Sequence, residues 1–177
     1  MNLWVRTFWV WITSFLKPRL GLLGESRLNG FVLPHDLDIY GHMNNGRYLT
    51  FMDLGRMDLI LRSGIAQPAG VHGWKPIVAG SWVRYRKPLK LLERFELRTR
   101  VAGWTDRWFV LEQQIVRKGR IYTQAYIQGV FVGPKGRVSC SRVLDALAYE
   151  EKSPPLPAFV TDWLEMHVTS SRLPGGH

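Results

Sequence analysis

The segment DLDIYGHMNNGRY, residues 36–48, gathers side chains that can take part in acid–base or acyl-transfer chemistry. It holds two aspartates, a histidine and two adjacent asparagines, and an apolar run follows it. Such a loop suits a site where a carboxylate and backbone donors act on one carbonyl group. The same residue types also bond to nearby backbone in turns and caps, so a purely structural loop is the alternative interpretation.

The helix that follows this loop would supply the donors. Asn44 is a good N-cap, which places Asn45 and Gly46 in the first helical turn. The first N–H groups of a helix lack intrahelical partners, and with the helix dipole they suit an oxygen that gains negative charge. Gly46 has no Cβ and lets a substrate approach closely. The Asp38 carboxylate would then attack the carbonyl carbon or activate a water.

The elements expected around this loop are one buried helix and a sheet. A first strand covers 27–34 and a helix covers 45–63, with an apolar stripe at Tyr48, Met52, Gly55 and Leu59. Four strand-like runs follow, at residues 77–89, 94–104, 107–119 and 120–132, and a short helix near 141–150 is capped by Ser139 or Ser141. We therefore predict an α+β fold, with a curved antiparallel sheet of five to six strands around one long central helix.

Residues 3–16 predict a separate N-terminal amphipathic helix with a narrow polar stripe. At roughly 1.5 Å per residue it would be about 21 Å long, which is short of the ~30 Å hydrocarbon core of a bilayer. Its three tryptophans, with Lys17 and Arg19 behind them, favour contact with a membrane surface. The alternative is a helix that docks on the domain or on a second subunit.

The composition limits the function classes. The 177 residues carry a formal charge of +10, which by itself attracts nucleic acid, anionic lipid or a phosphate-rich small molecule. No nucleic-acid-binding motif accompanies the charge, so we expect no nucleic-acid partner. The single cysteine, Cys140, excludes an intramolecular disulfide and fits a reducing, cytoplasmic location, with the protein peripheral to a membrane. Neither metal-binding spacings nor G-x-S-x-G occur, so no metal, cofactor or serine nucleophile is expected.

The segment HDLDIYGHMNNGRYLTFMDLGR resembles the signature of the hot-dog-fold acyl-CoA thioesterases, the 4-hydroxybenzoyl-CoA thioesterase-like superfamily. That signature is D-x-D-x-x-G-H-x-N-N-x-x-Y, followed by the long central helix. The resemblance extends over about residues 27–148, because the order of strand, helix and four strands also agrees. The fixed positions of the signature are all present here: Asp36, Asp38, Gly41, His42, Asn44, Asn45 and Tyr48.

This resemblance implies hydrolysis of acyl-CoA or acyl-carrier-protein thioesters, with Asp38 as the catalytic carboxylate. The backbone N–H of Asn45, with Gly46 beside it, would polarise the thioester carbonyl. A non-catalytic acyl-CoA- or lipid-binding protein with the same fold is the alternative. Three residues are secondary catalytic candidates: His42 as a proton shuttle, and Asp53 and Asp58 on the central helix.

The resemblance also implies partners. Arg84, Arg86 and Lys87 are candidates to bind the phosphates of coenzyme A, and Lys135 and Arg137 are a second set. Members of the family form dimers or tetramers with active sites at the subunit interface, so a homodimer or tetramer is expected. The chain is then divided into an N-terminal helix and linker, the thioesterase domain and a C-terminal surface tail, at residues 1–25, 26–150 and 151–177.

Overall fold

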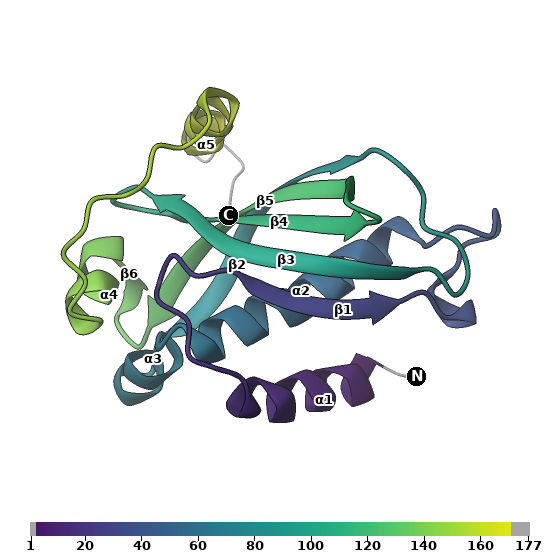
Figure 1. The fold of residues 1–177 in the computed structure, drawn as a ribbon. Coiled ribbons are helices and arrows are strands. Elements are labelled where there is room, and N and C mark those ends of the chain that lie inside the picture. The colour runs from purple at the N-terminus through teal and green to yellow at the C-terminus, as the bar shows by residue number, and fades with distance from the viewer. Residues whose placement is uncertain (1–2, 171–177) are drawn as a thin grey trace.

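A computed structural model describes residues 3–170 of the protein. These residues form a six-stranded antiparallel sheet with helices on both faces (Figure 1). In Figure 1, α1 lies below the sheet, α5 lies above it, and α2 runs behind β1 and β3. The elements in chain order are α1 (Leu3–Leu16), β1 (Ser26–Phe31), a 3-10 turn η1 (Pro34–Asp36), α2 (Asn45–Arg62), α3 (Ala66–His72), β2 (Lys75–Tyr85), β3 (Arg94–Trp104), β4 (Phe109–Arg117), β5 (Arg120–Gly133), β6 (Gly136–Val138), α4 (Cys140–Ala146) and α5 (Ala158–Ser170).

The strand order is β1-β3-β4-β5-β2, and the short β6 pairs with β5. In β3 the buried residues alternate with more exposed ones, so one face of this strand packs against α2. The register shifts within β2 between Val78 and Gly80, and within β3 between Val101 and Gly103. Such irregularities increase strand twist and bend. The sheet curves around α2, which confirms the predicted hot-dog fold.

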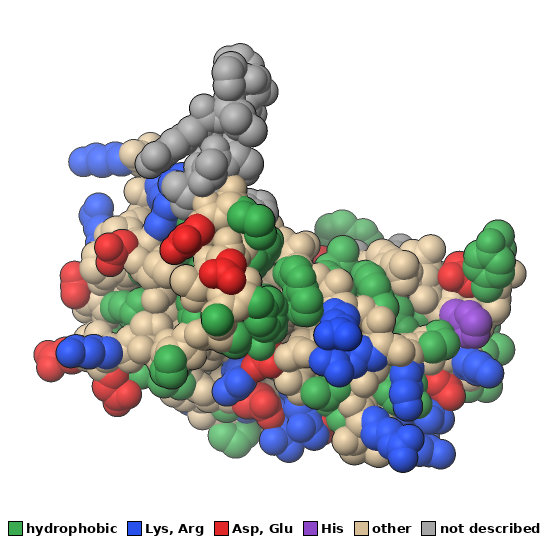
Figure 2. Space-filling model, turned by 90° about the horizontal axis from the view of Figure 1, so that it is seen from above, with side chains coloured by type: hydrophobic (Ala, Val, Ile, Leu, Met, Phe, Trp, Pro, Cys, Tyr) green, Lys and Arg blue, Asp and Glu red, His purple; other side chains and the backbone are tan. Residues whose placement is uncertain are grey.

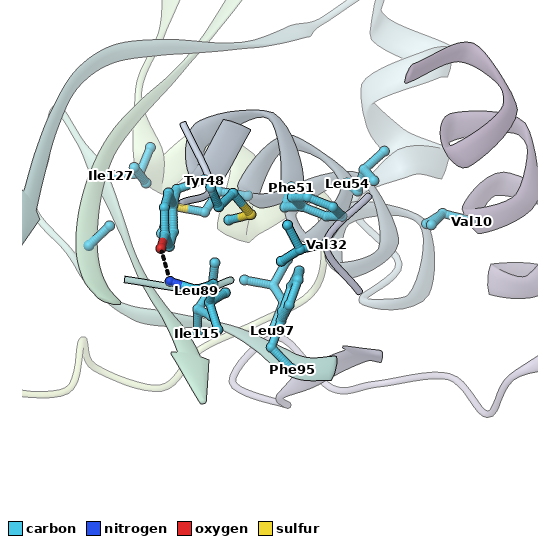
Figure 3. Packing of buried hydrophobic residues seen from close by; sticks show 13 residues of the cluster. Val10, Val32, Tyr48, Phe51, Leu54, Leu89, Phe95, Leu97, Ile115 and Ile127 are labelled. Carbon is cyan, nitrogen blue, oxygen red and sulfur yellow. Dashed lines mark hydrogen bonds between the residues drawn. The ribbon is translucent and has the colours of Figure 1, made fainter. Parts of the chain in front are cut away.

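Helix α2 begins where the sequence predicts, because the Asn44 side chain accepts the N–H of Gly46 at 2.9 Å. The predicted apolar stripe is confirmed: Tyr48, Met52 and Leu59 are at most 2% exposed. Figure 3 shows side chains from α2 and the sheet packed together, with the Tyr48 hydroxyl bonded to the backbone N–H of Leu89 at 3.0 Å. The buried stripe fixes the rotation of α2 about its axis, and with it the direction of its first turn.

Helix α1 docks on the domain with its polar side inward. Arg6, Val10 and Ser14 are buried, and α1 packs along α2. The docking alternative for this helix is therefore confirmed for contact within the chain. Most of its apolar side chains stay exposed, among them Trp4, Phe8, Trp9 and Leu16. No helix in residues 3–170 is both long and apolar enough to cross a membrane.

Helix α5 covers part of the outer face of the sheet. Val160 and Leu164 are buried against Trp108, Val110 and Tyr126. The sequence analysis did not predict this helix and assigned its residues to the tail. The segment SPPLP before it has the composition of an irregular connection, and an apolar face of a short helix is hard to distinguish from a mixed tail. The division of the chain at residues 25 and 150 stays a prediction.

Candidate active site

The loop before α2 is a tight hairpin that its own backbone holds. Leu37 and Met43 form an antiparallel bridge, and the N–H of Asp38 donates to the carbonyl of His42 at 2.8 Å. Gly41 has φ +74°, in the left-handed region that glycine adopts without steric cost. Its N–H donates to the Asp38 carbonyl at 3.1 Å. These contacts define one backbone path through the loop.

The carboxylate of Asp38 is half-buried, and one of its oxygens is bonded. Oδ1 accepts the backbone N–H of Tyr40 at 2.9 Å and that of His42 at 3.3 Å. Within residues 3–170, no group donates to Oδ2. The two amides hold the orientation of the side chain, because both donors are part of the hairpin itself. The second oxygen is left for a substrate or a water.

The start of α2 offers one unpaired backbone donor. The N–H of Gly46 is already used by the Asn44 cap at 2.9 Å, whereas the N–H of Asn45 meets no acceptor in the described part of the chain. Asn45 is exposed, so a ligand can reach this group. Of the two predicted residues, Asn45 is therefore the available donor. Glycine at position 46 leaves room for the Asn44 cap, because a Cβ there would lie 3.2 Å from the Asn44 side-chain oxygen.

Tyr85 links the end of β2 to this helix start. Its hydroxyl donates to the carbonyl of Asn45 at 3.2 Å, and its ring meets the Tyr48 ring edge-on with the centroids 5.2 Å apart. Burial raises the pKa of Tyr85, so the hydroxyl stays a neutral donor near pH 7. The contact supports the first turn of α2 from outside the helix.

Asp36, the first aspartate of the loop, is fully buried in a pair with α1. Arg6 donates to Oδ1 at 3.1 Å and to Oδ2 at 2.8 Å, and the N–H of Leu33 donates to Oδ2 at 2.9 Å. Burial raises the pKa of Asp36, but the hydrogen bonds from Arg6 and Leu33 and the charge of Arg6 together hold it below the ordinary 3.8. Its backbone carbonyl accepts the N–H of Asn44 at 2.8 Å. Asp36 thus shapes the loop.

Asp58 is the second fully buried carboxylate, and both of its oxygens are bonded. Ser14 donates to Oδ1 at 2.7 Å, and Ser26 donates to Oδ2 at 2.6 Å. Lys17 lies 3.3 Å from Oδ1, and Arg62 lies 3.0 Å from Oδ2. Burial by itself raises the pKa of Asp58. The hydrogen bonds and the charge of Lys17 outweigh this effect and hold the pKa below the ordinary 3.8. The geometry favours a structural role, because neither oxygen is left for a substrate.

Asp53 differs from Asp58, since its side chain is 65% exposed and pairs with Arg56. Arg56 also donates to the Gln113 side chain at 2.7 Å, and Gln113 in turn donates to the Met52 carbonyl at 2.9 Å. Burial lowers the pKa of Arg56 to about 10. Asp53 is therefore held in an ion pair within α2, and the bond from Arg56 to Gln113 links α2 to β4.

An apolar cavity of about 360 Å³ lies between α2 and the sheet, within the roughly 300–1,000 Å³ range of small-molecule sites. Its walls come from the second half of α2 and from β2, β4 and β5, including Ile77, Val78 and Ile127. Asp53 and Arg56 are the charged residues among its lining. Asp38 and Asn45 do not line it. The structure therefore places the loop at the start of α2 and the cavity further along the same helix.

The predicted coenzyme A residues lie at the end of β2 and just after it. Arg84, Arg86 and Lys87 are all exposed, and the N–H groups of Arg86 and Lys87 donate to the Tyr122 carbonyl at 2.8 and 3.1 Å. Tyr85 bonds to α2, whereas Arg84 and Arg86 alternate with it and face the other side of the sheet, where Arg86 donates to the Gln124 side chain at 3.2 Å. In Figure 2, basic side chains are spread over a face that also carries hydrophobic and acidic groups.

The model of the thioesterase-like superfamily matches residues 32–164, which is most of the chain. The chain belongs to the thioesterase-like superfamily. It is 35% identical to Protein THEM6 of Xenopus laevis over 154 residues, covering 85% of this chain and 72% of that protein. It is 27% identical to the long-chain acyl-CoA thioesterase FadM of Escherichia coli over 103 residues, covering 57% of this chain and 78% of that one.

The fold of the superfamily is also found among solved structures. The crystal structure of YbaW, a probable thioesterase from Escherichia coli, superposes with a TM-score of 0.65 at 24% identity. The match covers 68% of this chain and 95% of that one.

Cys140 and His42 are two further groups whose side chains could react. Cys140 is buried, and burial, with the nearby Asp106 charge, raises the pKa of its thiol to about 12, which disfavours a thiolate nucleophile near pH 7. His42 is half-buried and its backbone forms a bridge with Lys90. No cluster of three or more metal-ligating side chains occurs in the part of this superfamily member that the structure describes.

Residues far away in the sequence support the site, and they were not predicted. Arg6 bonds to Asp36 across 30 positions, and Tyr85 reaches Asn45 across 40. Gln113, which fixes Arg56, lies 57 positions away. The one available signal was the isolated arginine in the polar stripe of residues 3–16, since a charge on a mostly apolar helix requires a partner when buried.

Proposed function

We propose that this chain hydrolyses the thioester bond of acyl-CoA, or of an acyl carrier protein, to a free acid and a thiol. One observation carries the proposal: a hairpin that holds Asp38 with one free oxygen ends in the unpaired N–H of Asn45. These are the acid group and the carbonyl donor that thioester hydrolysis needs. Membership of the superfamily and the similarity to FadM support this function.

In the proposed mechanism the substrate carbonyl oxygen accepts the N–H of Asn45. Asp38 either takes a proton from the attacking water or attacks the carbonyl carbon itself, and in the second route water then hydrolyses the resulting anhydride. In both routes a C–O bond forms and the C–S bond breaks. The thiolate leaves and takes up a proton, and the acyl group departs as the free acid. His42 is kept as a proton shuttle in this proposal.

Asp53 remains the competing acid, and one observation favours it. It is a lining residue of the 360 Å³ cavity, which Asp38 is not. Its pairing with Arg56 argues against this role, because that contact holds it as a charged partner. A comparison of single variants at the two positions separates the two assignments.

Asp38→Asn is predicted to lower kcat by roughly 10²–10⁴-fold, since it removes the general base or nucleophile while keeping the side-chain shape. The measurement is release of free thiol from a series of acyl-CoA substrates of increasing chain length. Asp53→Asn should change kcat by less than tenfold. Asp145→Asn, at an exposed position on α4, is the matched control and should leave the rate unchanged.

Two results would count against this assignment. Asp38→Asn with the wild-type rate would exclude the loop aspartate, and a large loss in Asp53→Asn alone would transfer the role to α2. A wild-type protein that binds acyl-CoA but releases no thiol from any member of the series would support the alternative, a non-catalytic acyl-CoA- or lipid-binding protein.

The proposal extends to the coenzyme. We assign the phosphate groups of coenzyme A to Arg84, Arg86 and Lys87, because these exposed cations flank Tyr85 in the sequence, and Tyr85 bonds to the helix start that would hold the thioester. Neutralising Arg84 and Lys87 together should raise KM for acyl-CoA several-fold and leave KM for a short thioester without a nucleotide unchanged. An equal rise for both substrates would reject the assignment.

The proposal also includes a homodimer, or a tetramer built from it. β2 is an edge strand with exposed Ile77 and Val78, and these residues also line the cavity beside α2. Pairing of two such edges would cover them and close the cavity. Sedimentation equilibrium should give a dimer or tetramer mass, and a monomer at micromolar concentration would reject this part. We place the protein in the cytoplasm, peripheral to a membrane.

A further inference from the structure

Helix α1 presents an outward face that is unusually apolar for a protein surface. Its polar residues Arg6 and Ser14 are buried and bond to Asp36 and Asp58. On the outward face Trp4 is 78% exposed, Trp9 67% and Phe8 61%. Rings of this kind gather where a protein meets a membrane surface, because each has an apolar body and Trp adds a polar N–H. An exposed cluster of this size needs a partner.

A second apolar groove, of about 430 Å³, lies between α1 and the β1 edge of the sheet. Phe8 and Trp9 of α1 form one wall, Leu28 and Phe31 of β1 form another, and Phe95 is part of the lining. Exposed rings of α1 are thus also walls of the groove. An aliphatic chain that enters the groove would therefore be continuous with the apolar surface outside it.

A basic recess adjoins this groove. It has a volume of about 720 Å³ and shares Phe31 and Phe95 with the groove. Four cations line it, together with the single acid Glu96: Arg94, Arg98, Arg117 and Lys118. Arg98 pairs with Glu96 at 2.5 Å, and Arg117 pairs with Glu93 at 3.1 Å. Arg94 and Lys118 are exposed, and they give the recess its positive charge.

We propose that the α1 face, the groove and the basic recess together form a binding site for an anionic phospholipid of a membrane surface. One acyl chain lies in the groove between α1 and β1, and the phosphate lies against Arg94 and Lys118. The aromatic face of α1 rests in the headgroup region around this lipid. The site deepens the prediction that residues 3–16 contact a membrane, and it is independent of the hydrolytic activity.

The charge and shape of the site favour a membrane lipid over the other partners. A protein partner would suit the apolar face but would leave the basic recess without a matching anion. A monomeric fatty acid carries one carboxylate and would leave the outer face of α1 exposed to water. A bilayer with anionic headgroups matches all three parts at once.

The test is sedimentation of the full-length protein with vesicles. Vesicles of phosphatidylcholine mixed with phosphatidylserine should bind the protein more tightly than vesicles of phosphatidylcholine alone. Replacing Arg94 and Lys118 by Gln should reduce binding to the mixed vesicles roughly tenfold or more. The matched control replaces Lys75 and Lys152 by Gln, which removes the same charge from exposed positions outside the recess and should leave binding near wild type.

A second pair of variants tests the groove. Phe31 is 44% exposed, so Phe31→Asp should leave the fold intact and reduce binding by placing a negative charge on the wall shared with the recess. Val71→Asp, at a position 78% exposed on α3, makes the same charge change elsewhere and should bind like wild type. Brominated acyl chains in the mixed vesicles should quench tryptophan fluorescence in wild type and less in Phe31→Asp.

Three outcomes would overturn the proposal. The first is equal binding to charged and uncharged vesicles, and the second is equal loss in the recess variants and their matched control. The third is binding of monomeric dodecanoate without binding to vesicles, which would assign the site to a free fatty acid. A wild-type thioesterase rate in all these variants would show that lipid binding and hydrolysis are separate.

Discussion

At the scale of single residues, Gly55 shows how closely α2 approaches the sheet. A Cβ at this position would meet the Thr99 hydroxyl and would lie 2.8 Å from a Leu97 methyl group. Both neighbours are buried in β3, so neither can move away cheaply. Glycine therefore lowers the intrinsic helix propensity of α2 in exchange for contact between helix and strand.

Gly55→Ala should lower the free energy of unfolding by about 1–2 kcal/mol, because the overpacking cost exceeds the gain in helix propensity. The measurement is urea denaturation. Gly70→Ala on α3 is the control, since nothing lies within 4 Å of the added Cβ, and it should be neutral or slightly stabilising. An equal or higher stability for Gly55→Ala would contradict the close packing.

At the scale of elements, α1 is tied to the domain by the buried ion pair of Arg6 with Asp36 and by the hydrogen bond of Ser14 to Asp58. Arg6→Met should lower the free energy of unfolding by about 3–5 kcal/mol, because it leaves Asp36 charged and buried without its main partner. Arg27→Met removes the exposed pair with Glu25 and should cost at most about 1 kcal/mol. Similar losses in both variants, by urea denaturation, would mean that α1 does not dock as described.

Helix α5 offers a second test at this scale. Leu164 is 4% exposed against the outer face of the sheet, so Leu164→Ala should cost about 2–5 kcal/mol of unfolding free energy. Met166 on the same helix is 62% exposed, and Met166→Ala should change the stability little. If thermal unfolding gave equal stabilities for the two variants, α5 would not be packed on the sheet in solution.

At the scale of the whole molecule, three buried carboxylates predict the response to acid. The pKa values of Asp36 and Asp58 lie below 3.8. Burial raises the pKa of Glu112, but the hydrogen bonds from Arg100, Gln114 and Gln124 outweigh this effect and lower it below 4.5. The unfolded chain therefore binds more protons than the folded one as the pH falls below about 4.5. The contribution of these carboxylates to stability should be constant above this pH and decrease below it.

Urea denaturation at a series of pH values measures this dependence. Asp58→Asn should be less stable at pH 7 and should lose less stability than wild type on acidification, because one of the carboxylates is gone. A wild-type curve that stays level down to pH 3 would contradict the lowered pKa values.

How far the sequence predicted the molecule depends on the separation of the interacting residues. Asp38, Asn44 and Asn45 stand within one short segment, so their geometry followed from turn and capping rules. The buried stripe of α2 followed from its helical period. Arg6, Tyr85 and α5 were not predicted, because their contacts join segments that are far apart in the chain. The apolar face of α5 is too short for periodicity to separate it from irregular structure.

The inward-facing side of α1 has a practical consequence for anyone who shortens this protein. A version that starts at residue 26 would strip Arg6 from Asp36, and Ser14 and Lys17 from Asp58. Asp36 would lose its bidentate partner inside the domain, and Asp58 would keep only Ser26 and Arg62. Weak activity in such a fragment would then reflect a damaged interior, whatever role the missing leader has at a bilayer. Point changes on the outer rings avoid this confusion.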